Sequence, residues 1–226
     1  MIERLGSQTA AIVIIFMVFL GIILLFQIFG KLFFQIKGHF SETSVRGEET
    51  FNELRGKELL NSKVKTKKGY FLPTFYSYHK KKDEFIIPKA WDKENLLVNM
   101  NAIQAIIFAD EKRRRAPFFR LQYIGLSILS LIPYAIFLVI MILTFVPKVD
   151  VNGRVPMGAW ISVEALCIIG WVIMLLGYFW WINVTQKFGE RIEELAEETL
   201  DKNLGLQLKN YMNAMSYIPY SIRMLI

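Results

Sequence analysis

Histidine, cysteine and acids inside apolar segments are the side chains with which this chain could do chemistry, and it has few of them. There are two histidines and one cysteine in 226 residues. His39 and His79 do not form HExxH, the helical motif in which two imidazoles bind zinc and a glutamate activates water. A single cysteine excludes an internal disulfide framework and a cysteine-rich metal site. We therefore expect no metal and no cofactor.

Motifs for phosphate binding and acyl transfer are absent as well. The sequence contains no GxxxxGK[ST] loop, whose backbone N–H groups would hold phosphates. It also contains no GxSxG turn after a strand, which would present a nucleophilic serine. These absences argue against a P-loop nucleotidase and against an α/β-hydrolase.

Glu164 is the one acidic residue inside a long apolar segment. An ionisable side chain in a membrane segment is by default a hypothesis for a functional site, here a relay or transport path. Glu164 also lies about two helical turns from the end of its segment, where it can reach headgroups or remain protonated. A functional and a structural role both stay open. Cys167, one turn later, is expected to be an apolar filler.

A run of four cations, Lys112, Arg113, Arg114 and Arg115, precedes the second apolar segment directly. A second group occupies residues 80–82. No aromatic residues are interleaved with these cations to form a nucleic-acid surface, so we expect no nucleic-acid partner. Beside a membrane segment, such a cluster sets topology and attracts anionic lipid headgroups, and we expect that role here.

Three long apolar segments must position these residues. Apolar residues make up 54% of the chain although it carries 27 Lys and Arg against 20 Asp and Glu. The apolar residues are concentrated in 9–30, 121–146 and 158–182, each long enough to cross a hydrocarbon core of about 30 Å as a helix. The first lacks a basic flank and cleavage site, which favours an uncleaved anchor. Asn152-Gly153, a turn-forming pair, joins the other two as a membrane hairpin.

The distribution of positive charge predicts the orientation. Residues 31–120 contain 19 Lys and Arg, and 183–226 contain five, whereas the loop between the second and third segments contains two. Cation-rich flanks remain on the cytosolic side of a membrane. We therefore predict a multi-pass protein of the cell membrane, with the N-terminus and hairpin loop outside and the soluble module and C-terminus in the cytosol.

The soluble parts read as a small α/β module and a helical tail. Helical spacing of apolar residues predicts helices over 41–61 and 93–112, and aromatic residues around the charged KKKD turn predict a β-hairpin within 63–88. In the tail, a helix is expected to end at Gly205, and 211–226 is expected to form an interfacial helix. The predicted parts are an N-terminal transmembrane anchor (1–34), a cytosolic α/β module (35–120), a transmembrane hairpin (121–182) and a helical tail (183–226).

The order of these parts resembles the neutral zinc metallopeptidase family of membrane proteins, of the YugP type. Residues 71–107, FLPTFYSYHKKKDEFIIPKAWDKENLLVNMNAIQAII, are similar to the stretch in which a hairpin leads into the helix that bears HExxH. APFFRLQ at 116–122 resembles the start of the family's next span. INVTQKFGERIEELA and LKNYMNAMSYIPYSI resemble its two tail segments.

The resemblance implies a degenerate member of that family. Counted back from Ala116-Pro117, the motif positions fall on Ile103, Gln104 and Ile107, and the third, carboxylate ligand falls near Lys187. Isoleucines and a lysine cannot hold zinc or activate water. The implied protein is a pseudo-peptidase without catalytic residues.

Three functions remain open from the sequence. The first is a non-catalytic membrane protein that serves as a structural or regulatory subunit of a membrane complex, with itself or with a different chain. The second is a peptidase-like enzyme or transporter accessory with an unrecognised site, for example at Glu164. The third is a lipid-binding or membrane-organising protein. Small residues in 158–182 favour close helix packing, and the apolar faces of 96–109 and 211–226 require cover.

Overall fold

The computed structural model describes residues 7–57, 62–67, 77–145, 157–199 and 202–218. The chain is mostly helical and has one small sheet, as the sequence predicts. In chain order the elements are α1 (Ser7–Phe40), α2 (Gly47–Lys57), β1 (Lys63–Lys67), β2 (Tyr78–His79), β3 (Glu84–Pro88), the short 3₁₀ helix η2 (Lys89–Asp92), α3 (Leu96–Arg114), α4 (Phe118–Phe145), α5 (Met157–Thr199) and α6 (Lys202–Ser216).

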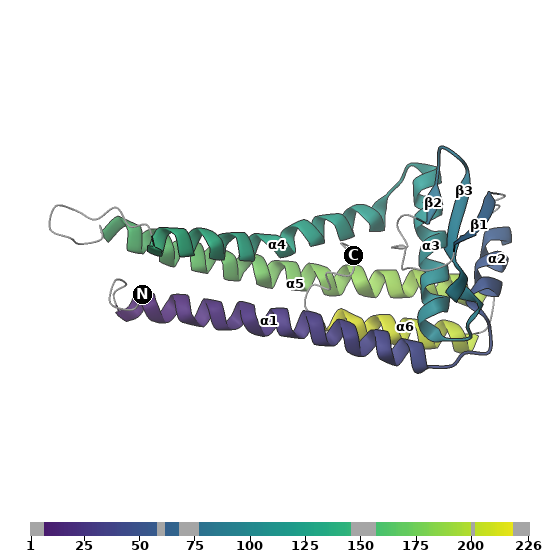
Figure 1. Ribbon diagram of the computed structural model, residues 1–226, viewed down its shortest axis with the longest axis horizontal. Helices are drawn as coiled ribbons and strands as arrows, with labels where there is room; N and C mark the ends of the chain where they lie inside the picture. The colour runs from purple at the N-terminus through teal and green to yellow at the C-terminus, as the bar shows by residue number, and fades with distance from the viewer. Residues whose placement is uncertain (1–6, 58–61, 68–76, 146–156, 200–201, 219–226) are drawn as a thin grey trace.

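Three helices, α1, α4 and α5, are long and apolar enough to cross a membrane. They run side by side along the longest axis of the molecule, and the α/β module lies at one end of them (Figure 1). Many of their large apolar side chains are exposed, including Phe19, Leu138 and Ile168. Such a surface is unusual for a soluble monomer and matches what a lipid-facing bundle presents. The three predicted apolar segments are thus found as three candidate membrane-spanning helices.

Two of these helices extend well beyond the apolar segments that predict them. α1 continues to Phe40 and α5 continues to Thr199, so the sequence boundaries at 34 and 182 fall inside continuous helices. The extension of α5 contains no proline and buries Phe188, Ile192 and Leu195. In this extension the apolar residues recur at helical spacing and form one buried face, and the polar residues form the other. The chain therefore continues as an amphipathic helix after the apolar segment ends.

The predicted hairpin is present, but the sheet has a third strand with a different direction. β2 pairs with β3 in antiparallel fashion, and Lys80–Asp83 form the turn between them. β1 pairs with β3 in parallel fashion, with Val64 opposite Phe85, which gives the strand order β1-β3-β2. The parallel pairing is not evident from the sequence because it depends on the path of the chain between β1 and β2.

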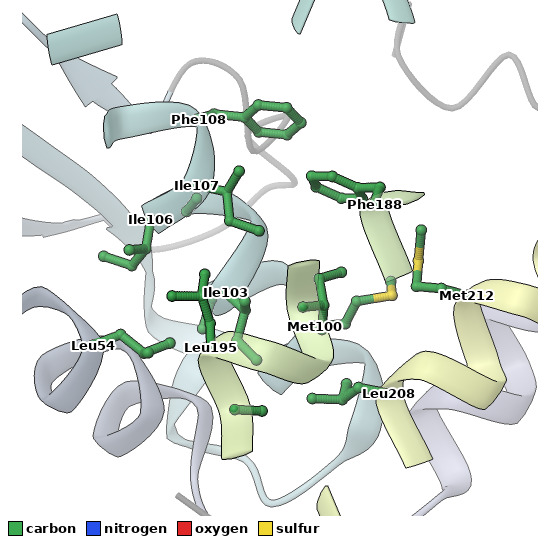
Figure 2. Packing of buried hydrophobic residues seen from close by; sticks show 14 of the residues in the cluster. Leu54, Met100, Ile103, Ile106, Ile107, Phe108, Phe188, Leu195, Leu208 and Met212 are labelled. Atoms are coloured by element: carbon green, nitrogen blue, oxygen red, sulfur yellow. The ribbon is translucent and has the colours of Figure 1, made fainter. Parts of the chain in front are cut away.

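Helix α3 is the centre of the module's apolar core. Its apolar residues are buried on nearly all sides, as is typical of a helix that other elements surround. Figure 2 shows α3 side chains packed between Leu54 of α2, Phe188 and Leu195 of α5, and Leu208 and Met212 of α6. The same cluster includes Tyr123 and Leu126 of α4. The module and the cytosolic ends predicted for the bundle helices therefore share one core.

Gly205 does not end a helix, contrary to the sequence prediction. It lies inside α6, where a Cβ atom would stand 3.4 Å from both the Ala196 Cβ and the Glu193 carbonyl oxygen of α5. A glycine at this point therefore permits close approach of the two helices instead of ending one of them. The end of α6 returns towards α1, where Ile218 packs on Gly30. The rest of the predicted interfacial helix, 219–226, lies outside the described residues, as does the Asn152-Gly153 turn.

Candidate functional site

The four degenerate motif positions do not form one polar site. Ile103 and Ile107 of α3 are buried in the apolar core, at 0% and 6% exposed. Lys187, on α5, is exposed to solvent. Figure 2 shows Ile103 and Ile107 among other apolar side chains of the cluster. The space that a metal and its ligands would need at positions 103 and 107 is therefore filled by packed hydrocarbon.

Gln104 is the polar member of this group, and its contacts are structural. It is buried, and its amide nitrogen lies 3.9 Å from the sulfur of Met212 on α6. In the part of the chain that the structure describes, no group of three or more His, Cys, Asp or Glu side chains lies close enough to hold a metal ion. His39 and His79 are both exposed and lie on different elements, α1 and β2.

Glu164 is brought into contact with a residue that is 155 positions away in sequence. The Thr9 hydroxyl donates a hydrogen bond of 2.6 Å to Glu164 Oε1. Thr9 is buried and Glu164 is partly exposed. The bond joins the start of α1 to the start of α5, so the acid has a structural contact that the sequence did not reveal. Cys167 is buried in the neighbouring cluster with Phe16 and Val163, as expected for an apolar filler.

The basic run 112–115 forms a sharp corner between α3 and α4. Arg115 adopts the left-handed conformation, with φ 58° and ψ 27°, and its N–H donates to the Glu111 carbonyl oxygen. The N–H of Ala116 donates to the same oxygen at 3.2 Å. Both bonds thus satisfy one of the carbonyl groups that a helix end otherwise leaves without partners. The chain then turns directly into α4.

Lysines from two elements are fixed at this corner by backbone carbonyl oxygens. Lys80, in the hairpin turn, donates to the carbonyl oxygens of Lys112 at 3.0 Å and Arg113 at 3.3 Å. Lys112 in turn donates to the Tyr78 carbonyl oxygen at 2.8 Å. The hairpin therefore delivers a further cation to the end of α3, where a positive charge also complements the helix dipole. The cluster predicted from residues 112–115 is larger than its sequence run.

Glu111 is a structural residue of this corner that the sequence analysis did not identify. Its carboxylate oxygens accept hydrogen bonds from the N–H groups of Phe119, at 2.7 Å, and Arg120, at 3.1 Å. Those N–H groups belong to the first turn of α4 and have no partner within the helix. Burial raises the pKa of Glu111 above its usual range, although the two N–H groups act in the opposite direction. A carboxylate seven residues before the first residue of a helix is too distant for the usual capping patterns, so no local signal marks it.

The apolar face of 96–109 and the described part of the 211–226 face, 211–218, pack against other parts of the chain. α3 and α6 contribute to one buried cluster with α5, as described above. Tyr211 of α6 also donates a hydrogen bond to the Phe34 carbonyl oxygen of α1, and its ring packs edge-on against the Phe34 ring. The module, the described part of the tail and the bundle therefore pack together. The 96–109 face needs no second chain to cover it.

Comparison with known proteins adds no assignment. No family model, no curated protein and no solved structure matches the chain.

Proposed function

We propose that this chain is a non-catalytic, multi-pass protein of the cell membrane that serves as a structural or regulatory subunit of a membrane complex. The observation that supports the non-catalytic part of this proposal most directly is the packing of α3. Ile103 and Ile107, which stand at the positions of zinc ligands in the family that the sequence resembles, are core residues here. We accordingly propose a pseudo-peptidase, in which the helix that would bear the active site has become the centre of a packed core.

The main alternative is an accessory to a transporter, with Glu164 as its working group. A transport role requires the carboxylate to face a polar path, and its contact with Thr9 instead supports a role in holding α1 against α5. The lipid-binding reading is not an alternative in the same sense, because a membrane subunit can also bind lipid. We therefore keep the subunit role as the proposal.

Metal content and hydrolysis distinguish a pseudo-peptidase from an active peptidase. Protein purified in mild detergent is expected to contain no stoichiometric zinc and to hydrolyse no peptide in a chelator-sensitive manner. Replacement of Ile103→His, Gln104→Glu and Ile107→His together is expected to lower the melting temperature without creating activity, because the new polar groups would be buried in hydrocarbon and Lys187 remains a cation. Chelator-sensitive hydrolysis by the unmodified chain would contradict the proposal.

The mass of the native assembly tests whether the chain is a subunit of a complex. A single chain has a mass of 26.3 kDa. Native mass spectrometry of vesicles made directly from the source membrane is expected to show the chain in a larger, stoichiometric assembly. A monomer under these conditions, with a bound complement of lipid alone, would leave the membrane-protein assignment intact and remove the subunit role.

A further inference from the structure

We propose that the corner between α3 and α4 binds the headgroups of anionic phospholipids and so holds the module against the membrane surface. The binding surface, here called the basic corner, consists of Lys80, Lys112, Arg113, Arg115 and Arg120. The inference rests on the proposed insertion of α4 in a membrane, and it is independent of whether the chain is a subunit or a pseudo-peptidase.

The first observation is that cations from separate elements gather at the basic corner with few acids to neutralise them. The interactions of Lys80 and Lys112 described above are with carbonyl oxygens, which orient the ammonium groups but leave their charge uncompensated. Among the residues that the structure describes, three acids lie nearby. Asp110 pairs with Arg114 at 2.8 Å, Glu111 accepts the N–H groups of α4, and Asp83 accepts hydrogen bonds from Ser62 and Tyr78.

The cations of the basic corner lie close enough to repel one another. Burial lowers the pKa of Lys112, and the charges of Arg120 and Lys80 lower it further. Arg113 also interacts with Asp83, so part of its charge is balanced within the chain. A phosphate group placed among Lys80, Lys112 and Arg120 would relieve the remaining repulsion, since lipid phosphates carry the opposite charge.

The second observation is the backbone of Arg115. A residue with φ of 58° at a helix C-terminus is most often glycine, because a Cβ atom is disfavoured there. The chain has an exposed arginine in this position instead. The left-handed backbone therefore carries a cation that is exposed at the end of α3, next to the start of α4.

The third observation places the basic corner at the level of headgroups. The exposed apolar stripe of α4 begins at Phe118 and Leu121, which are 54% and 61% exposed, three and six residues after Arg115. Nearby, the Trp180 indole donates to the Gln122 side chain at 2.6 Å, and tryptophan is enriched at membrane interfaces. Figure 1 shows α4 diverging from α5 as it approaches α3, so the corner stands to the side of the bundle. In a membrane, this position lies above the surrounding lipid.

The test compares lipids retained by the whole protein. The chain is placed in nanodiscs that contain equal amounts of phosphatidylcholine and phosphatidylglycerol, and native mass spectrometry counts the lipids that remain bound after release. We expect the unmodified chain to retain phosphatidylglycerol preferentially. Each cation near a membrane surface strengthens binding about fivefold, so Arg115→Gly should weaken the preference about fivefold. Arg113→Gln with Arg115→Gly should weaken it further, by at most about 25-fold, because part of the Arg113 charge is already balanced within the chain.

The variants distinguish a loss of lipid binding from a loss of folding stability. Arg115→Gly relieves the left-handed backbone, so it should melt at the same or a higher temperature while binding less phosphatidylglycerol. The control, Lys63→Gln with Lys67→Gln, removes two exposed charges from β1, away from α4, and should leave the preference unchanged. The proposal is overturned if the unmodified chain shows no preference between the two lipids, or if the control weakens the preference as much as the double variant does.

Discussion

At the scale of single residues, Glu111 is the side chain that connects the soluble module to a candidate membrane-spanning helix. It belongs to α3, yet both of its oxygens serve the first turn of α4. An acceptor at this point stabilises a helix start by roughly 0.5–2 kcal/mol. The sharp turn at Arg115 brings the carboxylate close enough to do so. A substitution that removes these two hydrogen bonds should weaken the connection between α3 and α4.

Glu111 should make the stability of the protein depend on pH. Because its pKa is raised in the folded chain, the folded state keeps a proton that the unfolded state loses. Stability therefore falls as pH rises from the ordinary glutamate value, about 4.3, through the raised value. Glu111→Gln, which stays neutral and can still accept a hydrogen bond, should flatten that part of the profile of melting temperature against pH.

A second variant separates charge from capping at the same residue. Glu111→Ala removes both acceptors and should lower the melting temperature throughout the pH range, because the Phe119 and Arg120 N–H groups then lose their partner. If Glu111→Gln retained the full pH dependence of the unmodified chain, another group would be responsible for it.

Gly170 should be intolerant of even one added carbon. A Cβ atom there would lie 2.7 Å from Cε2 and Cζ of the Phe16 ring, which is fully buried between α1 and α5. Gly170→Ala is therefore expected to destabilise the packing of α1 on α5 by about 1–3 kcal/mol. The melting temperature in detergent measures this effect.

Gly21 provides a matched control for the same substitution. It lies in α1, and a Cβ atom there meets nothing within 4 Å. Gly21→Ala should be neutral or stabilising, by up to about 1 kcal/mol, because alanine is the better helix former. Equal effects of the two substitutions would show that backbone preference, and not contact with Phe16, decides the outcome.

The sequence identified some of these residues but none of their distant partners. Glu164 is conspicuous as an acid in an apolar segment, whereas its donor Thr9 is an ordinary residue near the N-terminus. Lys80 and Lys112 are recognisable as cations, but their meeting depends on how the hairpin packs on α3. Charge and hydropathy are local properties of a sequence. Pairings over such separations depend on the complete fold.

At the scale of elements, one buried asparagine fastens the linker after α1 to α3. Asn99 is fully buried. Its amide nitrogen donates to the Thr43 hydroxyl at 2.8 Å, the Val45 carbonyl oxygen at 2.9 Å and the Asn95 carbonyl oxygen at 3.1 Å. Its amide oxygen accepts a hydrogen bond from the Thr50 hydroxyl of α2. The satisfied network fixes where α2 begins relative to the core.

Asn99→Ala should therefore release the segment that contains α2. Loss of the amide leaves several buried polar groups without partners. Each such group that water cannot reach lowers the free energy of unfolding by about 1–3 kcal/mol. We expect a lower melting temperature and faster amide hydrogen exchange in residues 43–54. Asn52→Ala, at an exposed position of α2, is the control and should change neither quantity. Unchanged exchange in the Asn99 variant would mean that the backbone contacts of this linker suffice.

Local patterns predicted the elements better than their ends. The apolar repeat of 93–112 and the KKKD turn gave α3 and the β2–β3 hairpin correctly. The length of α5 was missed because polar residues after 182 suggested a separate tail, whereas they form the solvent face of the same helix. Gly205 was misread because a glycine that ends a helix and one that admits a neighbouring helix look alike in sequence.

At the scale of the whole molecule, the module and the bundle cannot be treated as separate folding units. One apolar cluster draws residues from α2, the sheet, α3, α4, α5 and α6. A small domain alone buries a limited fraction of its surface, so the module gains stability from the start of α4 and the extended end of α5. A second cluster, with Phe16, Ile140 and Cys167 among its members, joins α1, α4 and α5 at the other end. Each long helix is thus held at both ends.

The proposed orientation of this assembly is the last prediction. Residues 31–120 hold 19 Lys and Arg and the 147–157 loop holds two, so the module should remain in the cytosol and the loop should be outside. Two variants, Lys67→Cys and Asn152→Cys, each add one cysteine. Labelling of that cysteine by a membrane-impermeant maleimide in intact cells reports the side of the membrane on which it lies. Native Cys167 contributes little background because it is 1% exposed. Labelling should occur at position 152 in intact cells and at position 67 only after the membrane is opened. Labelling at position 67 alone in intact cells would reverse the orientation, and with it the side of the membrane on which the basic corner meets lipid.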